Sequence, residues 1–366
     1  MRHMVPGIRS RWAAIVVALA LLTGTTILAT TPGPKGQRPV QAREERVLPP
    51  GLERLQAQIE RAIAAANGSV GVGLKHLESG VELYVNGDEP YPMASTVKVA
   101  VLIELYAKVK AGQLDWNERV EVTPDHRVTG SGQLFVLFDP PGVQLSLHNV
   151  ANLMMLISDN SATDICISKA LKEDINKRLA SLGIKGMRVD RTIAELLSRP
   201  DPVPGAKPEP PPENEPEALA AALAFQRRQI ARWVQIDQTA ADPRDQATPR
   251  AFISIFEKLW RGEVVDPESS AAMLETMKRC STGAARIKGL LPARTVVAHK
   301  TGSLGGVHDD VGIIYLPDGA GHLAIAVLSK SVRATSEEAD RVIAEIARYA
   351  YDYFHFTGQA AKTAAQ

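Results

Sequence analysis

The alternation of apolar and polar positions predicts secondary structure at both ends of the chain. Residues 52–68, LERLQAQIERAIAAANG, place apolar side chains at helical spacing and finish on a glycine suited to stop a helix. Residues 69–77 and 81–86, SVGVGLKHL and VELYVN, flank a short turn and predict a β-hairpin. Apolar runs suited to strands return at 294–301, 310–319 and 322–330, before a last helix expected from about Ser336 to Phe354.

A mostly helical segment, from about residue 94 to residue 280, separates these two groups of strands. Strands from both ends must pair across it, so we expect one domain over residues 51–357 and a tail at 358–366. The expected fold class is α/β, an α+β sandwich: an antiparallel sheet flanked by helices from both chain ends, plus an inserted all-α subdomain at about 94–280. Residues 198–240 begin with a proline-dense run and predict a surface insertion that leads into an amphipathic helix.

The N-terminus is typical of an exported protein. Arg2, Arg9 and Arg11 precede a short apolar run, so residues 1–29 predict a secretory signal peptide. The small-x-small cleavage pattern is poor, and an uncleaved N-terminal membrane anchor stays open as the alternative. Residues 30–50 predict a proline-rich, charged linker. We therefore expect a periplasmic or secreted protein that meets the membrane only through such an anchor.

Composition narrows the classes of function. The 366 residues are 45% hydrophobic and 23% charged, which is typical of a soluble globular protein. A net charge of +1 gives no electrostatic reason to expect a nucleic-acid partner. Cys166 and Cys280 lie far apart and have no metal-ligand spacing to nearby histidines. We expect two buried thiols, no metal, no cofactor and a monomer.

Three short motifs carry the candidate chemistry. Ser95 and Lys98 lie one helical turn apart in an otherwise apolar segment, YPMASTVKVAVLIELY (residues 91–106). Alone, this pair predicts a capping serine and a lysine that extends its amine to water. Residues 158–160, Ser-Asp-Asn, and residues 300–302, Lys-Thr-Gly, are equally weak signals when taken alone. Together, in the order S-x-x-K, S-D-N, K-T-G, they are specific for penicillin-recognising serine enzymes.

On these motifs the chain resembles class A serine β-lactamases and related penicillin-binding proteins, from about residue 51 to residue 357. The resemblance implies a β-lactamase/transpeptidase-like fold, with the active site in a cleft between a sheet domain and an all-α domain. It implies a catalytic group in which Ser95 is the acylated nucleophile, Lys98 its proton acceptor and Ser158 a proton shuttle, with Lys300 as its fourth member. It also implies that substrate is held by Asn160, which contacts an amide, and by Lys300, Thr301 and Ser303, which contact a carboxylate.

Elementary electrostatics agrees with these roles. A serine hydroxyl is a weak nucleophile until a neighbouring base takes its proton, and a lysine can be that base only if its pKa falls. The helix that begins near Ala94 and the second amine at Lys300 both disfavour a charged Lys98. The resemblance places the oxyanion hole at the backbone N–H groups of Ser95 and Ser303.

The chain departs from the family pattern in one loop. Alignment puts Ile193 where the family has the glutamate that activates the deacylating water, and Glu195 lies two residues on. Glu195 is expected to be a solvated carboxylate rather than a displaced base. Arg191 and Asp245 match residues that close the base of this loop with a salt bridge; an exposed pair of little energetic value is the alternative.

Two weaker predictions concern the rim of the site. His308 and Asp310 follow the third motif and could line the carboxylate pocket, although a histidine in a turn is usually just solvated. The segment from Thr129, TGSGQL, is expected to form the opposite rim of the cleft, or to be no more than a turn.

Three functions remain open at this point. The first is a β-lactamase that hydrolyses small-molecule β-lactams through an acyl-enzyme. The second is a penicillin-binding D-alanyl-D-alanine carboxypeptidase that acts on cell-wall peptides, which the missing glutamate favours. The third is a sensor or binding protein that is acylated once and stays modified. Turnover separates the third from the others, and the choice between lactam and peptide hydrolysis separates the first two.

Overall fold

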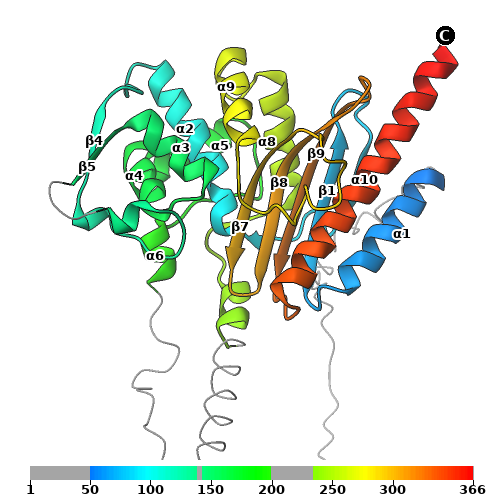
Figure 1. Ribbon diagram of the computed structural model, residues 1–366, viewed down its shortest axis with the longest axis horizontal. Helices are drawn as coiled ribbons and strands as arrows, with labels where there is room; N and C mark the ends of the chain where they lie inside the picture. Colours follow the sequence, from blue (N-terminus) through cyan, green and yellow to red (C-terminus); the bar gives the residue numbers. More distant parts are fainter. Residues whose placement is uncertain (1–49, 138–141, 199–233, 366) are drawn as a thin grey trace, which may run out of the picture. The chain divides into compact units, whose positions relative to one another are not determined.

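The computed structural model describes residues 50–137, 142–198 and 234–365. Its centre is a five-stranded antiparallel sheet in the order β2-β1-β9-β8-β7, and both chain ends supply its strands, as the sequence predicts (Figure 1). The strands of this sheet are β1 (Ser69–His76), β2 (Glu82–Val85), β7 (Val297–Leu304), β8 (Val307–Leu316) and β9 (Gly321–Lys330).

One face of the sheet is covered by the two terminal helices, α1 (Pro50–Ala64) and α10 (Ser336–Ala365), which lie side by side (Figure 1). Alternate residues along a strand point to opposite faces, so Ile314 and Ile325 pack under these helices while their neighbours Ile313 and Ala324 pack on the other face. The expected last helix is confirmed, and it runs past Phe354 through the residues expected to form a tail.

The other face of the sheet is covered by α8 (Pro249–Arg261) and α9 (Pro267–Lys278). Thr248 accepts a hydrogen bond from the Ala251 N–H and caps α8, and Gly262 ends it in the left-handed conformation. Phe252 is fully buried in the core. These two helices fall within the segment expected to form the all-α subdomain, yet they pack on the sheet.

A helical body, residues 94–197, lies beside the β7 edge of the sheet (Figure 1). Within it the structure describes the one-turn helices η1 (Ala94–Val97), η2 (Pro124–His126) and η3 (Leu134–Val136), and the helices α2 (Lys98–Lys110), α3 (Leu147–Leu156), α4 (Asn160–Ala170), α5 (Lys172–Ser181) and α6 (Ile193–Leu197). It is not purely helical, because β4 (Arg119–Val122) and β5 (Val143–Ser146) form an antiparallel pair inside it.

A second short pair joins the two halves of the fold. β3 (Tyr91–Pro92), just before η1, pairs with β6 (Gln246–Ala247), just before α8. This pair connects the residues just before Ser95 to the residues that follow the predicted insertion.

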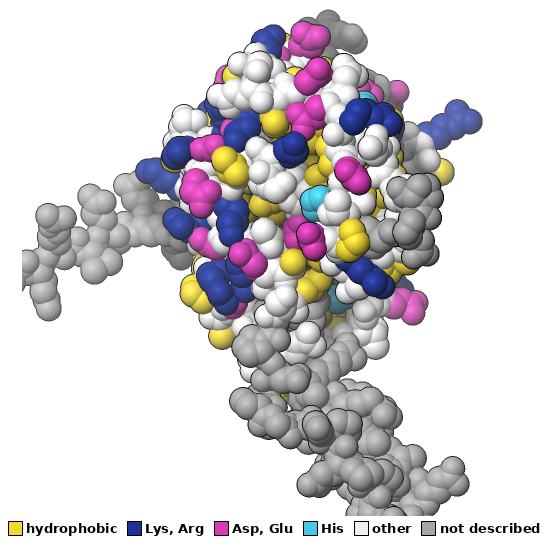
Figure 2. All heavy atoms as spheres, turned by 90° about the vertical axis from the view of Figure 1, so that its left-hand side faces the viewer, with side chains coloured by type: hydrophobic (Ala, Val, Ile, Leu, Met, Phe, Trp, Pro, Cys, Tyr) yellow, Lys and Arg dark blue, Asp and Glu magenta, His cyan; other side chains and the backbone are white. Residues whose placement is uncertain are grey.

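Several predictions fall outside the described residues: the signal or anchor at 1–29, most of the linker at 30–50, and most of the insertion at 198–240, from which the structure describes a helix at 234–241. Among the ranges that are described, none of the helices combines the length and hydrophobicity that a membrane span requires. On the face of the molecule shown in Figure 2, Lys and Arg side chains are interspersed with Asp and Glu, so neither sign of charge dominates that face.

Candidate active site

Ser95 lies on η1, which leads directly into α2. Lys98 is the first residue of α2, and its backbone N–H donates to the carbonyl oxygen of Ser95. Ala94, just before the serine, has a φ of +44°, in the left-handed region that residues with a Cβ rarely adopt. Thr96 Oγ1 donates to the Met93 carbonyl oxygen at 2.6 Å and holds this strained turn. Ser95 is partly exposed and Lys98 fully buried, so substrate can reach the hydroxyl while the amine is shielded from water.

The third motif lies beside this turn because β7 is an edge strand of the sheet. Its glycine is required by close packing: a Cβ on Gly302 would lie 2.7 Å from the Met93 carbonyl oxygen. On its other side β7 pairs with β8, with Ser303 opposite His308. An edge strand keeps one row of backbone N–H and C=O groups free of strand partners, which suits it to bind an extended substrate.

The three motifs meet at the hydroxyl of Ser158. Lys98 Nζ lies 3.0 Å from Ser158 Oγ and 2.8 Å from the Ser158 carbonyl oxygen, and it donates to Asn160 Oδ1 at 3.2 Å. Lys300 Nζ lies 3.0 Å from the same Ser158 Oγ and 2.8 Å from the Thr301 carbonyl oxygen. Two amines therefore donate to one hydroxyl oxygen, which leaves the hydroxyl hydrogen of Ser158 free for a third group.

Burial sets the protonation of both amines. Desolvation, with the like charge of Lys300 as the second cause, holds the pKa of Lys98 well below its usual value. Desolvation also lowers the pKa of Lys300, to about 8. Near neutral pH, Lys98 is therefore the amine suited to accept a proton and Lys300 the one suited to remain a cation.

Backbone contacts fix the second motif. Asp159 is fully buried, and its carboxylate accepts hydrogen bonds from the N–H groups of Gln133 (2.6 Å) and Leu134 (2.8 Å) and from Ala162 in α4. Asn160 Nδ2 donates to the Thr129 carbonyl oxygen at 2.8 Å. The structure thus places the TGSGQL segment directly against the S-D-N motif.

A buried arginine that the sequence analysis missed supports the third motif. Arg286, in the loop before β7, donates to Ser303 Oγ at 2.7 Å and to the Gly302 carbonyl oxygen at 2.8 Å. Its Nε pairs with Asp340 of α10 at 2.8 Å. The guanidinium brings a positive charge to the residue expected to hold a substrate carboxylate. No local motif marks it, because it reaches β7 only through the tertiary fold.

Of the two residues expected to line the carboxylate pocket, Asp310 does not do so, and His308 is not simply solvated. His308 is partly buried beside Asp340, with Nδ1 3.3 Å from Oδ1. Asp310 is fully buried and lies 2.9 Å from His299 Nδ1, so it is paired inside the protein and does not line a carboxylate pocket.

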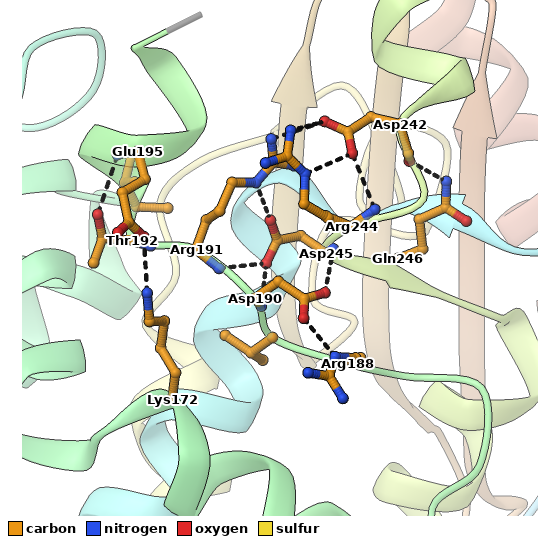
Figure 3. Close-up of polar contacts among 12 residues, drawn as sticks. Lys172, Arg188, Asp190, Arg191, Thr192, Glu195, Asp242, Arg244, Asp245 and Gln246 are labelled. Atoms are coloured by element: carbon orange, nitrogen blue, oxygen red, sulfur yellow. Dashed lines mark hydrogen bonds and ion pairs between the residues drawn. The ribbon is translucent and has the colours of Figure 1, made fainter.

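The loop that carries the departure from the family pattern is closed as predicted at its base (Figure 3). Arg191 and Asp245 form a buried ion pair, with Nε and Oδ2 2.5 Å apart, and Arg191 Nη1 reaches Asp242 at 2.8 Å. Asp245 Oδ1 also accepts the backbone N–H groups of Asp190 and Arg191. The exposed-pair alternative therefore does not hold.

The position where the family has its glutamate is occupied here by the apolar side chain of Ile193. Its side chain is 4% exposed and belongs to the hydrophobic core. Glu195 is exposed, accepts from the Thr192 N–H at 2.7 Å, and pairs with Lys172 at 2.9 Å (Figure 3). Asp164 of α4 accepts the N–H groups of Ile193 (2.6 Å) and of the next residue, and so holds the start of α6.

The site combines a serine hydroxyl at a strained helix start, a buried amine with a lowered pKa, and a hydroxyl that contacts two lysines. These features define the class of protein, which is an acyl-transferring serine enzyme. A family model described as "Beta-lactamase enzyme family" matches residues 54–354. The β-lactamase of Bacteroides uniformis is 34% identical over 345 residues, which cover 91% of this chain and 97% of that protein. The chain therefore belongs to the β-lactamase enzyme family and is a class A serine β-lactamase-type hydrolase.

Solved structures agree on the fold. The β-lactamase of Sphaerobacter thermophilus matches with a TM-score of 0.65 at 27% identity, over 82% of this chain and 97% of its own. A leucine-to-glutamate variant of PBP-A, solved as an acyl-enzyme complex with penicillin G, matches with a TM-score of 0.64 at 25% identity, over 84% of this chain and 100% of its own.

Proposed function

We propose that this protein opens β-lactam rings through an acyl-enzyme at Ser95 and releases the product slowly. The observation that carries the proposal is the hydroxyl of Ser158, which both Lys98 and Lys300 contact at 3.0 Å. One buried hydroxyl held by two amines of different proton affinity is what proton transfer from a nucleophile to a leaving nitrogen requires.

The acylation step follows from this geometry. Lys98, as the neutral amine, accepts the Ser95 proton while Ser95 Oγ attacks the lactam carbonyl carbon. The backbone N–H groups of Ser95 and Ser303 stabilise the negative charge on the carbonyl oxygen. As the tetrahedral intermediate collapses, Ser158 gives its proton to the lactam nitrogen and regains one from Lys98. The lactam C–N bond breaks, and the ester to Ser95 remains.

Substrate is oriented by groups around this centre. Asn160 contacts the side-chain amide of the substrate, while Lys300, Thr301 and Ser303 hold its carboxylate, and Arg286 strengthens the positive potential at Ser303.

Deacylation is the slow step of this mechanism. Hydrolysis of the ester needs a base that activates water, and Ile193 cannot accept a proton. Glu195 is already engaged by Lys172 and by the backbone, contacts that lower its pKa and its strength as a base. Losing a positioned base typically costs about 10²–10⁴ in rate, so the acyl-enzyme accumulates.

The lack of a base for deacylation at Ile193 also favours a second function, a D-alanyl-D-alanine carboxypeptidase that β-lactams inhibit. In a peptide acyl-enzyme the leaving amine, the terminal D-alanine, has departed, whereas an opened lactam keeps its amine attached to the acyl group, so slow release of a penicilloyl group is compatible with turnover of a peptide. The likeness to PBP-A supports this alternative.

Intact mass over time, after mixing with a penicillin, tests the proposal. We expect a single adduct to appear quickly and to decay slowly. Turnover with no accumulating adduct would refute slow deacylation, a permanent adduct would favour the sensor alternative, and no adduct at all would refute the nucleophile. Release of D-alanine from a cell-wall peptide at a higher rate than lactam hydrolysis would favour the carboxypeptidase.

We also propose that the chain acts outside the cytoplasm as a monomer. The basic start and apolar run of residues 1–29 support export, and the targets of such an enzyme lie on the outer side of the inner membrane. Cell fractionation with N-terminal sequencing tests export and cleavage, and sedimentation equilibrium tests the oligomeric state.

A further inference from the structure

Three side chains form a hydrogen-bonded chain that ends at the substrate-binding hydroxyl of Thr301. Cys280 Sγ lies 3.2 Å from Thr282 Oγ1, and Thr282 Oγ1 lies 2.6 Å from Thr301 Oγ1. Each contact joins two groups that can either donate or accept. The loop packs tightly against the strand here, since a Cβ on Gly283 would lie 2.4 Å from Thr301 Cγ2.

The thiol at the far end of this chain lies in a charged, buried setting. His299 Nδ1 is 2.9 Å from Asp310 Oδ1, both side chains are fully buried, and the charge of the imidazole ring acts on the Cys280 thiol. Burial opposes ionisation of the thiol, but His299, Lys300 and Thr282 outweigh it and lower the pKa of Cys280 to about 6.

The charged groups near the thiol come from three parts of the fold: Lys288 in the same loop, whose Nζ donates to the Cys280 carbonyl oxygen, His299 and Lys300 on β7, and Asp310 on β8. Three of these four groups can be cations, and the one anion is bound to the histidine. The setting therefore allows the thiol to exist as a thiolate that the positive charge of His299 stabilises.

Ionisation of Cys280 fixes the direction of the hydrogen bonds along this chain. A neutral thiol can donate to Thr282, which lets Thr282 donate to Thr301 and leaves the single hydroxyl hydrogen of Thr301 free for a substrate carboxylate. A thiolate can only accept, so Thr282 must donate to it and Thr301 must donate to Thr282. Thr301 then presents lone pairs to the carboxylate and repels it.

We propose that Cys280 and Thr282 are positioning residues that set whether Thr301 donates a hydrogen bond to the substrate carboxylate. The inference rests on the proposed function, in which Thr301 binds that carboxylate. The state with a neutral thiol is the competent one, and ionisation of the thiol weakens recognition of carboxylate-bearing substrates while leaving Ser95 and Lys98 untouched.

The test compares acylation by a penicillin and by its neutral methyl ester from about pH 5 to pH 9. The ratio of the two rates reports carboxylate recognition alone, because effects on Ser95 and Lys98 cancel. In the wild type we expect this ratio to fall in two steps: one of about tenfold as Cys280 ionises, the factor that one charge-assisted hydrogen bond provides, and one near pH 8 as Lys300 loses its proton.

Cys280→Ser keeps a donor of similar size that stays neutral, so the first step should vanish and the second should remain. Thr282→Val cuts the chain, and it should also remove the first step. Thiolate absorbance in the ultraviolet gives the ionisation of Cys280 directly in the unmodified enzyme, since burial raises the pKa of Cys166 far above this range.

The outcomes distinguish failure of this inference from failure of the proposed function. A first step that persists in Cys280→Ser or in Thr282→Val overturns the inference, as does thiolate absorbance that shows no ionisation across the first step. If penicillin acylates no residue at any pH, the proposed function fails instead. If acylation occurs but the ratio does not change with Cys280 ionisation, only the role of this chain is refuted.

Discussion

Replacing either partner of the Arg191–Asp245 pair should destabilise the protein by an amount that its contacts set. Arg191→Ala leaves Asp245 buried, but with two backbone N–H partners, so the cost should fall near the lower end of the roughly 3–5 kcal/mol for breaking a buried pair. Asp245→Ala also leaves those N–H groups without their acceptor, at about 1–3 kcal/mol each where they are buried. Asp245 has a φ of +52°, where alanine adds strain. The aspartate replacement should therefore cost more.

The measurement is a double-mutant cycle in urea unfolding. We expect a coupling free energy of about 2 kcal/mol, within the range of roughly 0.5–3 kcal/mol seen for contacting residues. Asp245→Asn removes the charge without adding backbone strain, because asparagine tolerates the left-handed conformation. Arg341 and Glu345 on α10 are the matched control, an i,i+4 pair with the arginine 74% exposed, where coupling should be only about 0.3–0.5 kcal/mol. Additive effects for Arg191 and Asp245 would refute the reasoning.

Four further predictions concern the site. Ser95→Ala should lose all covalent labelling by penicillin in intact mass spectra, and persistent labelling at the wild-type rate would exclude this nucleophile. Lys300→Ala should slow acylation by carboxylate-bearing lactams much more than by a neutral ester, and equal losses would contradict carboxylate binding. Asp164→Asn should loosen the start of α6 by about 1–3 kcal/mol in urea unfolding, because an amide oxygen replaces only one of two acceptors; an unchanged midpoint would contradict this. Ile193→Glu should shorten the life of the acyl-enzyme by up to about 10²–10⁴, measured by mass decay, and an unchanged decay would mean that this position does not reach the ester.

The parts of the fold that local pattern determines were predicted correctly. The β1–β2 hairpin, the three C-terminal strands and the last helix each carry their own periodicity and turn residues, so a short window suffices. The residues of the three motifs were found differently, through the S-x-x-K, S-D-N, K-T-G set that the chain shares with a known family, and the structure brings them together at Ser158.

The features of the structure that could not be predicted from the sequence depend on contacts between distant segments. α8 and α9 have ordinary amphipathic patterns, and nothing local says that they pack on the sheet rather than within the helical body. Arg286 reaches Ser303 only because the loop before β7 folds back along that strand. Cys280 was correctly expected to be buried, but its link to Thr301 through Thr282 depends on the same loop and on no motif.

The carboxylates near α6 also bear on deacylation. From the sequence, Glu195 lies two residues from the family's position and was expected to be a solvated carboxylate rather than a displaced base. In the fold, both carboxylates that accompany α6 are committed to its backbone: Glu195 accepts the Thr192 N–H, and Asp164 accepts those of Ile193 and Ala194. Either carboxylate would have to give up hydrogen bonds that hold the helix start before it could activate water. We therefore expect the contacts that order this loop to prolong the life of the proposed Ser95 ester, and loosening them to speed its release even as it lowers stability.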